Sequence, residues 1–207
     1  MRLRRPKVLP EVVPIVPLLH HRPFDDPAYL FEPKYDGFRG VLYLGREDPP
    51  FFRSKRGSVL TQFAELAHWV RAELGGVEVI LDGEVVALDA EGRQSIRELV
   101  AGRGNFHFAA FDVLWLQGKD LRHLPLGRRR RQLERLIPAT STVLSRILAV
   151  EGRGCDLFSA VERLDLEGMV AKRKRDRYAA TTTWLKVKNR AYTQMEGRGE
   201  LFHLKPR

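Results

Sequence analysis

Short apolar segments alternate with turn-forming residues through residues 29–190, and this alternation limits the possible folds more than any other feature of the chain. The segments with strand character are Phe38–Leu44, Phe51–Arg53, Val77–Leu88, Phe106–Leu116, Met169–Lys174 and Trp184–Val187. Helices are predicted at Leu60–Leu74, Leu126–Leu136 and Cys155–Leu164. This mixture predicts a single α+β unit dominated by antiparallel strands.

The chain divides by composition into three segments. Four of its 12 prolines, Pro6, Pro10, Pro14 and Pro17, lie within the first 17 residues. Because proline disfavours both helices and central strands, residues 1–28 are predicted to form an arm packed on the domain. The domain itself is expected at residues 29–190, followed by a short tail at residues 191–207.

The charge of the chain indicates the kind of partner it attracts. Lys and Arg total 36 against 26 Asp and Glu, which gives a net charge of +10 and favours binding to phosphate-rich polymers. Cys155 is the single cysteine, so an internal disulfide and a cysteine-based zinc cluster are excluded. No apolar run is long enough for a membrane helix. We expect a soluble, monomeric, cytoplasmic and nucleoid-associated protein without a membrane partner.

A run of four arginines, Arg128–Arg131, lies within the helix predicted at Leu126–Leu136. It has two interpretations, a nucleic-acid-binding patch or a solvated helix face. The apolar side of this helix would be formed by Leu126, Leu133 and Leu136, so the pattern favours the solvated face.

The segment Glu32–Arg39 (EPKYDGFR) carries the most chemical information. Lys34 stands two residues before Asp36-Gly37, a tight turn between apolar segments. A lysine at such a turn can point into a cleft, where dry or basic surroundings promote loss of its proton and make the amine a nucleophile. Taken alone, the pattern favours a Lys–Asp surface pair at a hairpin.

Five further segments follow in a fixed order and contribute acids, an aromatic ring and lysines. They are Ser54–Gly57, Leu81–Val86, Phe111–Leu114, Leu166–Lys172 and Trp184–Lys188. Together with Glu32–Arg39 they resemble the nucleotidyltransferase motifs of ATP-dependent DNA ligases, whose superfamily includes RNA ligases and mRNA-capping guanylyltransferases. The flanking residues look closest to bacterial and archaeal DNA ligases. The resemblance spans residues 29–190 and implies an antiparallel-sheet-rich, ATP-grasp-like adenylation domain.

The resemblance implies a catalytic and a metal-binding group. Lys34 would attack the α-phosphorus of ATP to form a lysyl-AMP intermediate, and Asp36 would help position the reacting groups at a nick. Glu167 would contact Mg²⁺ or Mn²⁺, with Asp82 as a weaker candidate. Phosphate chemistry independently favours such carboxylates, because Mg²⁺ binds a few of them together with phosphate oxygens and water.

The resemblance also implies a nucleotide-binding set. Its members are Glu32, Arg39, Lys55, Glu84, Phe111, Met169, Lys186 and Lys188. Glu32 would hold the adenine end, while Phe111 and Met169 would form an apolar slot for the ring. Arg39 would bind the nucleotide and the nick phosphate, and Glu84 the ribose. The two lysines near the end would hold the α-phosphate.

The chain departs from the family pattern at three places. Lys55, followed by Arg56, stands where these ligases usually have arginine, and Ala180 stands where many relatives carry another arginine. Only 19 residues follow Lys188, too few for the oligonucleotide-binding (OB) barrel that normally comes next. The resemblance implies nicked duplex DNA as a partner. Because the barrel is not expected within this chain, a separate OB-fold or repair protein is the other expected partner.

The leading hypothesis is an ATP-dependent DNA ligase-like nucleotidyltransferase, which transfers AMP from Lys34 to a 5′-phosphate at a DNA nick for phosphodiester joining. Two alternatives stay open at the level of the sequence. One is an RNA ligase or guanylyltransferase that uses the same lysine. The other is a non-catalytic module that binds nucleotide or nucleic acid.

Overall fold

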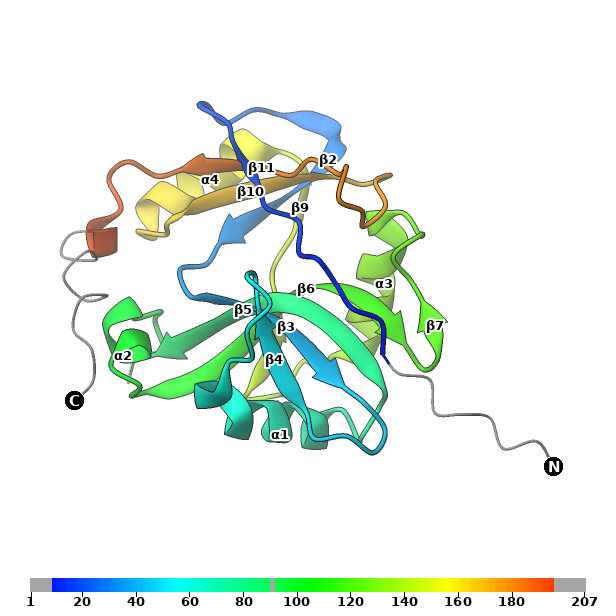
Figure 1. Ribbon diagram of the computed structural model, residues 1–207. Coiled ribbons are helices and arrows are strands. Elements are labelled where there is room, and N and C mark those ends of the chain that lie inside the picture. Colours follow the sequence, from blue (N-terminus) through cyan, green and yellow to red (C-terminus); the bar gives the residue numbers. More distant parts are fainter. Residues whose placement is uncertain (1–8, 90–91, 196–207) are drawn as a thin grey trace.

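The computed structural model describes residues 9–89 and 92–195, and these residues form two β-sheets that lie one above the other (Figure 1). The N-terminal segment crosses from one sheet to the other. The predicted α+β class with predominantly antiparallel strands is confirmed.

The six-stranded sheet is built from the middle of the chain. Its strands are β3 (Phe38–Leu44), β4 (Phe51–Ser54), β5 (Val79–Leu88), β6 (Asn105–Leu116), β7 (Lys119–Asp120) and β8 (Leu144–Arg146). The first five lie in the order β4-β3-β5-β6-β7 with antiparallel pairing, and β8 pairs with β6 in parallel. The predicted strands in this region are thereby confirmed to within two residues.

The five-stranded sheet joins the two ends of the described chain. Its strands are β1 (Leu18–Leu19), β2 (Asp26–Lys34), β9 (Val150–Gly152), β10 (Gly168–Arg173) and β11 (Leu185–Lys188). They lie in the order β1-β11-β10-β2-β9, and all pairs are antiparallel except β1 with β11. This pairing places strands from both ends of the chain side by side.

Helices cover the outer faces of the sheets. The 3₁₀ helix η1 (Thr61–Phe63), α1 (Ala64–Glu73), α2 (Ile96–Val100) and α3 (Leu126–Leu136) pack on the six-stranded sheet. Helix α4 (Gly154–Arg163) packs on the five-stranded sheet, and a second 3₁₀ helix, η2 (Thr193–Met195), follows β11. None of the helices in the described part of the chain is long and apolar enough to cross a membrane.

The N-terminal arm is more ordered than its proline content predicts. Leu18 and Leu19 form strand β1, and the side chains of Val12 and Ile15 are buried. These two side chains pack with residues of the six-stranded sheet and with Trp184 in one hydrophobic cluster. The arm thus contributes to the interior between the sheets.

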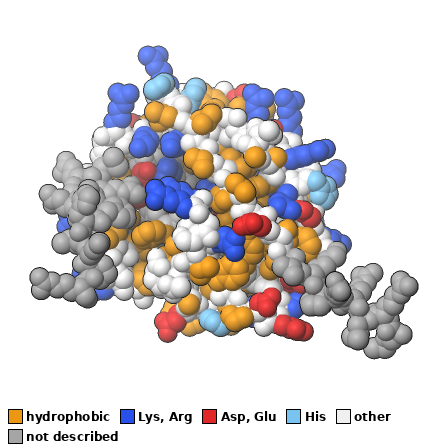
Figure 2. Space-filling view, in the orientation of Figure 1, with side chains coloured by type: hydrophobic (Ala, Val, Ile, Leu, Met, Phe, Trp, Pro, Cys, Tyr) orange, Lys and Arg blue, Asp and Glu red, His pale blue; other side chains and the backbone are white. Residues whose placement is uncertain are grey.

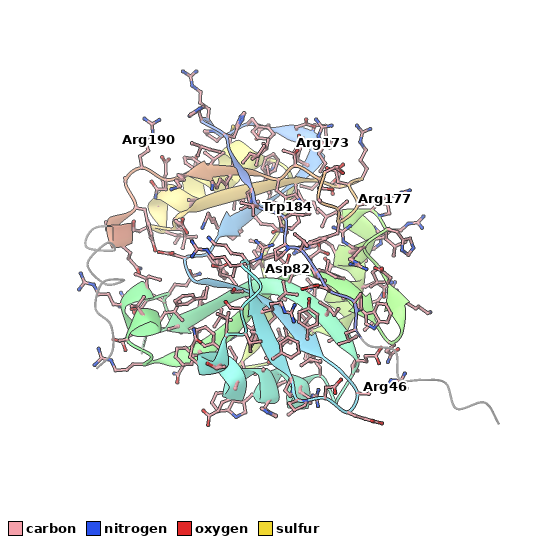
Figure 3. All side chains as sticks on the ribbon, in the orientation of Figure 1. Arg46, Asp82, Arg173, Arg177, Trp184 and Arg190 are labelled. Carbon is pink, nitrogen blue, oxygen red and sulfur yellow. The ribbon has the colours of Figure 1, made fainter. Side chains whose placement is uncertain are left out.

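The surface in the orientation of Figure 1 is unevenly charged. Figure 2 shows Lys and Arg side chains gathered over the five-stranded sheet and around a hollow near the centre of this face. In Figure 3, Asp82 and Trp184 lie in the interior between the sheets, whereas Arg173, Arg177 and Arg190 project outward.

Candidate active site

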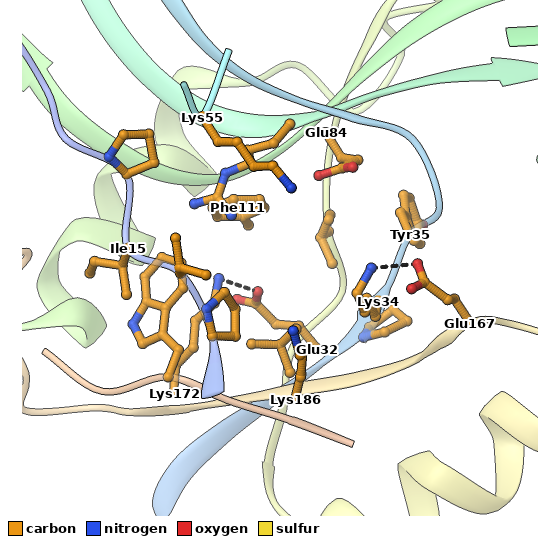
Figure 4. Close-up of a pocket in the computed structure, with 18 of the residues that line it drawn as sticks. Ile15, Glu32, Lys34, Tyr35, Lys55, Glu84, Phe111, Glu167, Lys172 and Lys186 are labelled. Atoms are coloured by element: carbon orange, nitrogen blue, oxygen red, sulfur yellow. Dashed lines mark hydrogen bonds and ion pairs between the residues drawn. The ribbon is translucent and has the colours of Figure 1, made fainter. Parts of the chain in front are cut away.

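A cavity of about 320 Å³ lies between the two sheets (Figure 4). Nine of the twelve predicted site residues line it: Glu32, Lys34, Arg39, Lys55, Glu84, Phe111, Glu167, Lys186 and Lys188. Figure 4 shows Ile15, Phe111 and Lys172 toward one end of the cavity, and Lys34 and Glu167 toward the other. The structure therefore brings most of the scattered motif residues to one place.

Lys34 is the last residue of β2 and lies opposite Gly168, the first residue of β10. This register brings Lys34 next to Glu167, and its Nζ donates a hydrogen bond to Glu167 Oε2. The Lys34 side chain keeps 25% of its surface exposed, whereas that of Glu167 is 6% exposed. The amine of Lys34 is thus held by a buried carboxylate but remains accessible from the cavity.

Strand β11 adds two lysines to the lining of the cavity. Lys186 and Lys188 are two residues apart and therefore point to one face of the strand. The pKa of Lys186 is lowered by partial burial and by the positive charges of Lys188 and Lys34. An anion such as a phosphate would relieve this repulsion.

The opposite wall comes from the six-stranded sheet. Arg39 on β3 is paired in register with Glu84 on β5, and its guanidinium lies 4.4 Å from the centre of the Phe111 ring. Burial raises the pKa of Glu84 to about 7, although the positive charges of Lys34 and Arg39 act in the opposite direction. This wall therefore combines an aromatic face, a cation and a readily protonated carboxyl group.

The structure separates the two candidates in the turn after β4. Lys55 lines the cavity, whereas Arg56 is not among the residues that line it. The lysine is therefore the side chain of this turn that faces the site.

Three predicted site residues do not line the cavity. Met169 is fully buried in the cluster between the five-stranded sheet and α4, so its side chain does not line the cavity. Its neighbour Val170 lines the cavity instead, because successive residues of a strand point to opposite faces. Asp36 is also buried and accepts a hydrogen bond from the Tyr192 hydroxyl at 3.2 Å.

Asp82 is the third of these residues. It is fully buried, and its carboxylate accepts hydrogen bonds from Arg39 Nε at 2.6 Å and from Arg39 Nη2 at 2.7 Å. The Tyr178 hydroxyl donates a further one at 2.6 Å. Because its oxygens are engaged behind the wall, Asp82 supports Arg39 and does not line the cavity.

Sequence reasoning missed the two buried cations that pair with the predicted residue Glu32 at the other end of the cavity. Lys172 Nζ lies 2.5 Å from Glu32 Oε2, and Arg130 Nη1 lies 3.1 Å from Glu32 Oε1. Lys172 Nζ is also 3.9 Å from the centre of the Phe111 ring. Burial lowers the pKa of Lys172, and the charge of Glu32 opposes this effect. The signal for Lys172 was its position two residues after Val170, on the same strand face.

The arginine run on α3 differs from the prediction. Arg128 and Arg131 are exposed, but Arg129 and Arg130 are buried, so the prediction of a solvated face is wrong for these two. Arg129 forms a bidentate ion pair with Asp112, and Arg130 donates hydrogen bonds to backbone carbonyl groups of β6 and of the segment after β8. The two side chains tie α3 to the rear of the site.

The residues present fit a metal ion that arrives with phosphate groups. Within residues 9–89 and 92–195, no group of three or more His, Cys, Asp or Glu side chains is arranged to hold a metal by itself. Mg²⁺, however, commonly uses one or two carboxylates and takes its other ligands from substrate phosphates and water. Glu84 and Glu167 both line the cavity and could supply those carboxylates.

The family of the chain follows from a comparison of its whole length. Residues 20–188 match the family model described as the ATP dependent DNA ligase domain. The chain belongs to this family. The resemblance inferred from the six motifs is therefore confirmed.

Two similar proteins illustrate the range of the family. The multifunctional non-homologous end joining protein LigD of Mycobacterium bovis is 32% identical over 167 residues, which cover 78% of this chain and 22% of LigD. The SPbeta prophage-derived DNA ligase-like protein LigB of Bacillus subtilis is 27% identical over 193 residues, covering 87% of this chain and 70% of LigB. The chain thus spans about a fifth of the length of LigD.

A solved structure supports the same assignment. A mycobacterial DNA ligase D complexed with ATP and MES superimposes with a TM-score of 0.74 at 28% sequence identity. The superposition covers 86% of this chain and 60% of that one. The arrangement of two facing sheets is therefore shared with a ligase that binds ATP.

Proposed function

We propose that this chain transfers AMP from ATP to Lys34, and from Lys34 to the 5′-phosphate of a nick in duplex DNA, where a 3′-hydroxyl then displaces AMP to join the strand. The observation that carries the proposal is the position of Lys34. Its amine faces the cavity beside Glu167 and near the two lysines of β11.

The first step requires a neutral amine. The ammonium group of Lys34 releases a proton to water, to which its partial exposure gives access. The nitrogen lone pair then forms a bond to the α-phosphorus of ATP, and the bond from that phosphorus to the bridging oxygen breaks. The oxygen leaves with the bonding electrons on pyrophosphate. The nitrogen then releases its second proton to water, and the product is a phosphoramidate between Lys34 and AMP.

The cationic side chains supply most of the catalysis. Phosphoryl transfer spreads negative charge over the equatorial oxygens, so it depends on positioning and positive charge more than on acid–base chemistry. Lys186 and Lys188 line the same cavity as Lys34 and would hold the α-phosphate. Lys55 and Arg39, on the opposite side, would contact the remaining phosphates of ATP and the phosphate of the nick.

The other residues would orient the nucleoside. The Phe111 ring would stack on adenine, and the adenine would replace part of the contact between this ring and the Arg39 guanidinium. Glu32, held by Lys172 and Arg130, lies at the same end of the cavity. Glu84 would accept a hydrogen bond from the ribose. Asp36, buried behind the turn, would hold Tyr35 and Lys34 in place for reaction at the nick.

A divalent cation completes this set. Glu167, together with Glu84, would hold Mg²⁺ or Mn²⁺ bound to the phosphates of ATP. The ion would neutralise negative charge on the phosphates. We further propose that the protein acts as a cytoplasmic, nucleoid-associated monomer, in DNA repair and recombination, with an OB-fold or repair protein as a partner.

The decisive experiment is intact mass spectrometry after incubation with ATP and Mg²⁺. The wild-type protein is expected to gain the mass of one AMP. Lys34→Ala and Lys34→Arg are expected to gain none, since neither variant has a reactive amine at this position. Lys119→Ala, which removes an exposed lysine far from the cavity, is the matched control and should react like the wild type.

The choice of substrate is tested on the adenylylated protein. Nicked DNA is expected to accept AMP at its 5′-phosphate, whereas nicked RNA should be a poor substrate. In a separate incubation of the unmodified protein, GTP in place of ATP should label it poorly. Preferential sealing of RNA, or labelling by GTP, would contradict the DNA ligase assignment. Binding of ATP or DNA without any covalent adduct would identify a binding module instead.

A further inference from the structure

The hydroxyl group of Tyr178 lies between two parts of the structure that both border the cavity. It donates a hydrogen bond to Asp82 Oδ2 at 2.6 Å and accepts one from the Ile15 backbone N–H at 3.3 Å. Tyr178 itself does not line the cavity, and its side chain is 6% exposed. Any effect of Tyr178 on the cavity therefore passes through the groups that it contacts.

On one side, the Tyr178 hydroxyl is connected to Arg39 through hydrogen bonds to Asp82. Asp82 is fully buried and makes a bidentate ion pair with the Arg39 guanidinium, which faces the cavity and lies over the Phe111 ring. The charged carboxylate gains a short, charge-assisted hydrogen bond from the tyrosine. The Tyr178 hydroxyl thus holds the Asp82 carboxylate in place, and this carboxylate in turn holds the Arg39 guanidinium.

On the other side, the Tyr178 hydroxyl contacts the N-terminal arm directly. The arm contributes Pro14–Pro17 to the lining of the cavity. The Ile15 side chain is buried, and its backbone N–H finds its acceptor in the tyrosine hydroxyl. Without that acceptor a buried N–H would be left without a partner, which is costly. The same oxygen therefore also determines how the arm lies on the cavity.

We propose that Tyr178 is a positioning residue, whose hydroxyl couples the N-terminal arm to Arg39 through Asp82 and thereby prepares the ATP cavity for its ligand. The inference rests on the proposed function, because ATP is the ligand it concerns. It assigns a role to the arm and to a tyrosine outside the six motifs.

The packing of the Tyr178 ring does not depend on the hydroxyl group. The ring packs edge-to-face on Trp184 with centroids 5.8 Å apart, and the Arg129 guanidinium lies 5.8 Å from its centre. Phenylalanine would keep both contacts. Burial and the charge of Asp82 raise the pKa of Tyr178 well above its ordinary value, so the hydroxyl stays protonated and able to donate.

Tyr43 offers a matched control. Its hydroxyl accepts a hydrogen bond from the Val12 backbone N–H at 3.0 Å, so it holds the same arm, and its ring is stacked on Phe51. Tyr43 does not line the cavity. Tyr43→Phe therefore removes an equivalent contact with the arm but leaves the hydrogen bond to Asp82 in place.

The test measures the dissociation constant of ATP by isothermal titration calorimetry in the full-length Lys34→Ala background, so that binding is read without the covalent step. Adding Tyr178→Phe is expected to raise this constant by about tenfold, the effect of losing a hydrogen bond to a charged group. Adding Tyr43→Phe is expected to change it by less than about twofold. Equal constants for the two variants would overturn the inference.

A second measurement separates positioning from general loosening of the fold. With Lys34 present, Tyr178→Phe should raise KM for ATP in the adenylylation reaction more than it lowers kcat. In the Asp82→Asn background the same change should have little further effect, because the two side chains act as one unit. Additive effects would overturn the coupling. Failure of the wild-type protein to form an AMP adduct would refute the proposed function but not the binding result, whereas absence of ATP binding would refute both.

Discussion

Arg129 and Asp112 form a bidentate ion pair that is almost completely withdrawn from solvent. Both nitrogen–oxygen distances are 2.8 Å, and the side chains of Arg129 and Asp112 are 1% and 0% exposed. The pair joins α3 to β6, the strand that carries Phe111. Arg129 also donates hydrogen bonds to two backbone carbonyl groups, so that its charge is compensated on several sides.

Removal of this arginine should strongly destabilise the fold. Arg129→Ala leaves the buried carboxylate of Asp112 without its partner, and we expect a loss of about 3–5 kcal/mol in the free energy of unfolding. Urea denaturation followed by circular dichroism measures the change. Arg128→Ala, at the exposed neighbouring position on the same helix, should stay within about 0.5 kcal/mol of the wild type. A similar stability for both variants would contradict the prediction.

Gly168 should resist substitution, because its Cα faces the neighbouring strand. A Cβ at this position would lie 2.2 Å from the Val187 carbonyl oxygen, so β10 and β11 would have to separate. Gly168→Ala is expected to lower the melting temperature, with a loss of about 1–3 kcal/mol, and to slow adenylylation, because Lys34 and Glu167 are adjacent.

Gly127 provides the comparison for this experiment. A Cβ there would meet its nearest heavy atom, the Lys174 carbonyl oxygen, at 3.7 Å, an ordinary contact. Gly127 lies within α3, where alanine is favoured over glycine by about 0.5–1 kcal/mol. Gly127→Ala should therefore melt at the same temperature as the wild type or above it. Equal melting temperatures for the two variants would refute the steric argument.

Lys186 should be needed for rate more than for stability. Lys186→Ala removes one of the cations that line the cavity together with Lys34, and we expect adenylylation to slow by about 10²-fold with little change in melting temperature. Single-turnover labelling with radioactive ATP gives the rate. Lys174→Ala removes a lysine whose ion pair with Glu151 is on the surface, and it should react normally. An unchanged rate in Lys186→Ala would exclude Lys186 from phosphate binding.

Glu84 should make the stability of the protein without ATP depend on pH. Its pKa is raised from 4.5 to about 7, so the folded state binds the proton more tightly than the unfolded state. The resulting stabilisation is complete below pH 4.5 and is lost as the pH rises through 7. Relative to Glu84→Gln, which cannot ionise, the wild type should lose about 1–3 kcal/mol over this range.

Urea denaturation at several pH values from 4.5 to 8 measures this difference. The expected loss of stability is moderate because Glu84 faces the cavity and keeps some contact with solvent. Glu65→Gln, on the exposed side of α1, should follow the wild-type profile. Parallel profiles for the wild type and Glu84→Gln would contradict the prediction.

Local sequence patterns were sufficient for much of this fold. The limits of α3 were predicted to the residue, and β3 and β6 to within one residue, because each combines a clear apolar period with turn residues at its ends. The motif around Lys34 was located in the same way, since Asp36-Gly37 marks the turn after it. Such features depend only on neighbours in the sequence.

Other features depend on partners far along the chain. Nothing near Arg130 indicates that it lies against Glu32, 98 positions away, so a basic run was interpreted as solvated. Met169 was assigned to the cavity in place of Val170 because β10 has buried positions on both faces, which removes the alternation that shows which side points inward. The arm could not be predicted to enter the cavity, since its acceptors are the hydroxyls of Tyr43 and Tyr178.

The pairing of β1 with β11 and of β2 with β10 constrains how the protein can form on the ribosome. The strands of the six-stranded sheet all lie within residues 38–146, so this sheet can assemble while synthesis continues. The first two strands must wait for β10 and β11, which are made after all the strands of this sheet. Lys34 emerges early, but the cavity in which it lies cannot close until residue 188 has left the exit tunnel. An unfinished chain therefore exposes the amine without a place for ATP, and adenylylation should begin only when the domain has been synthesised through β11.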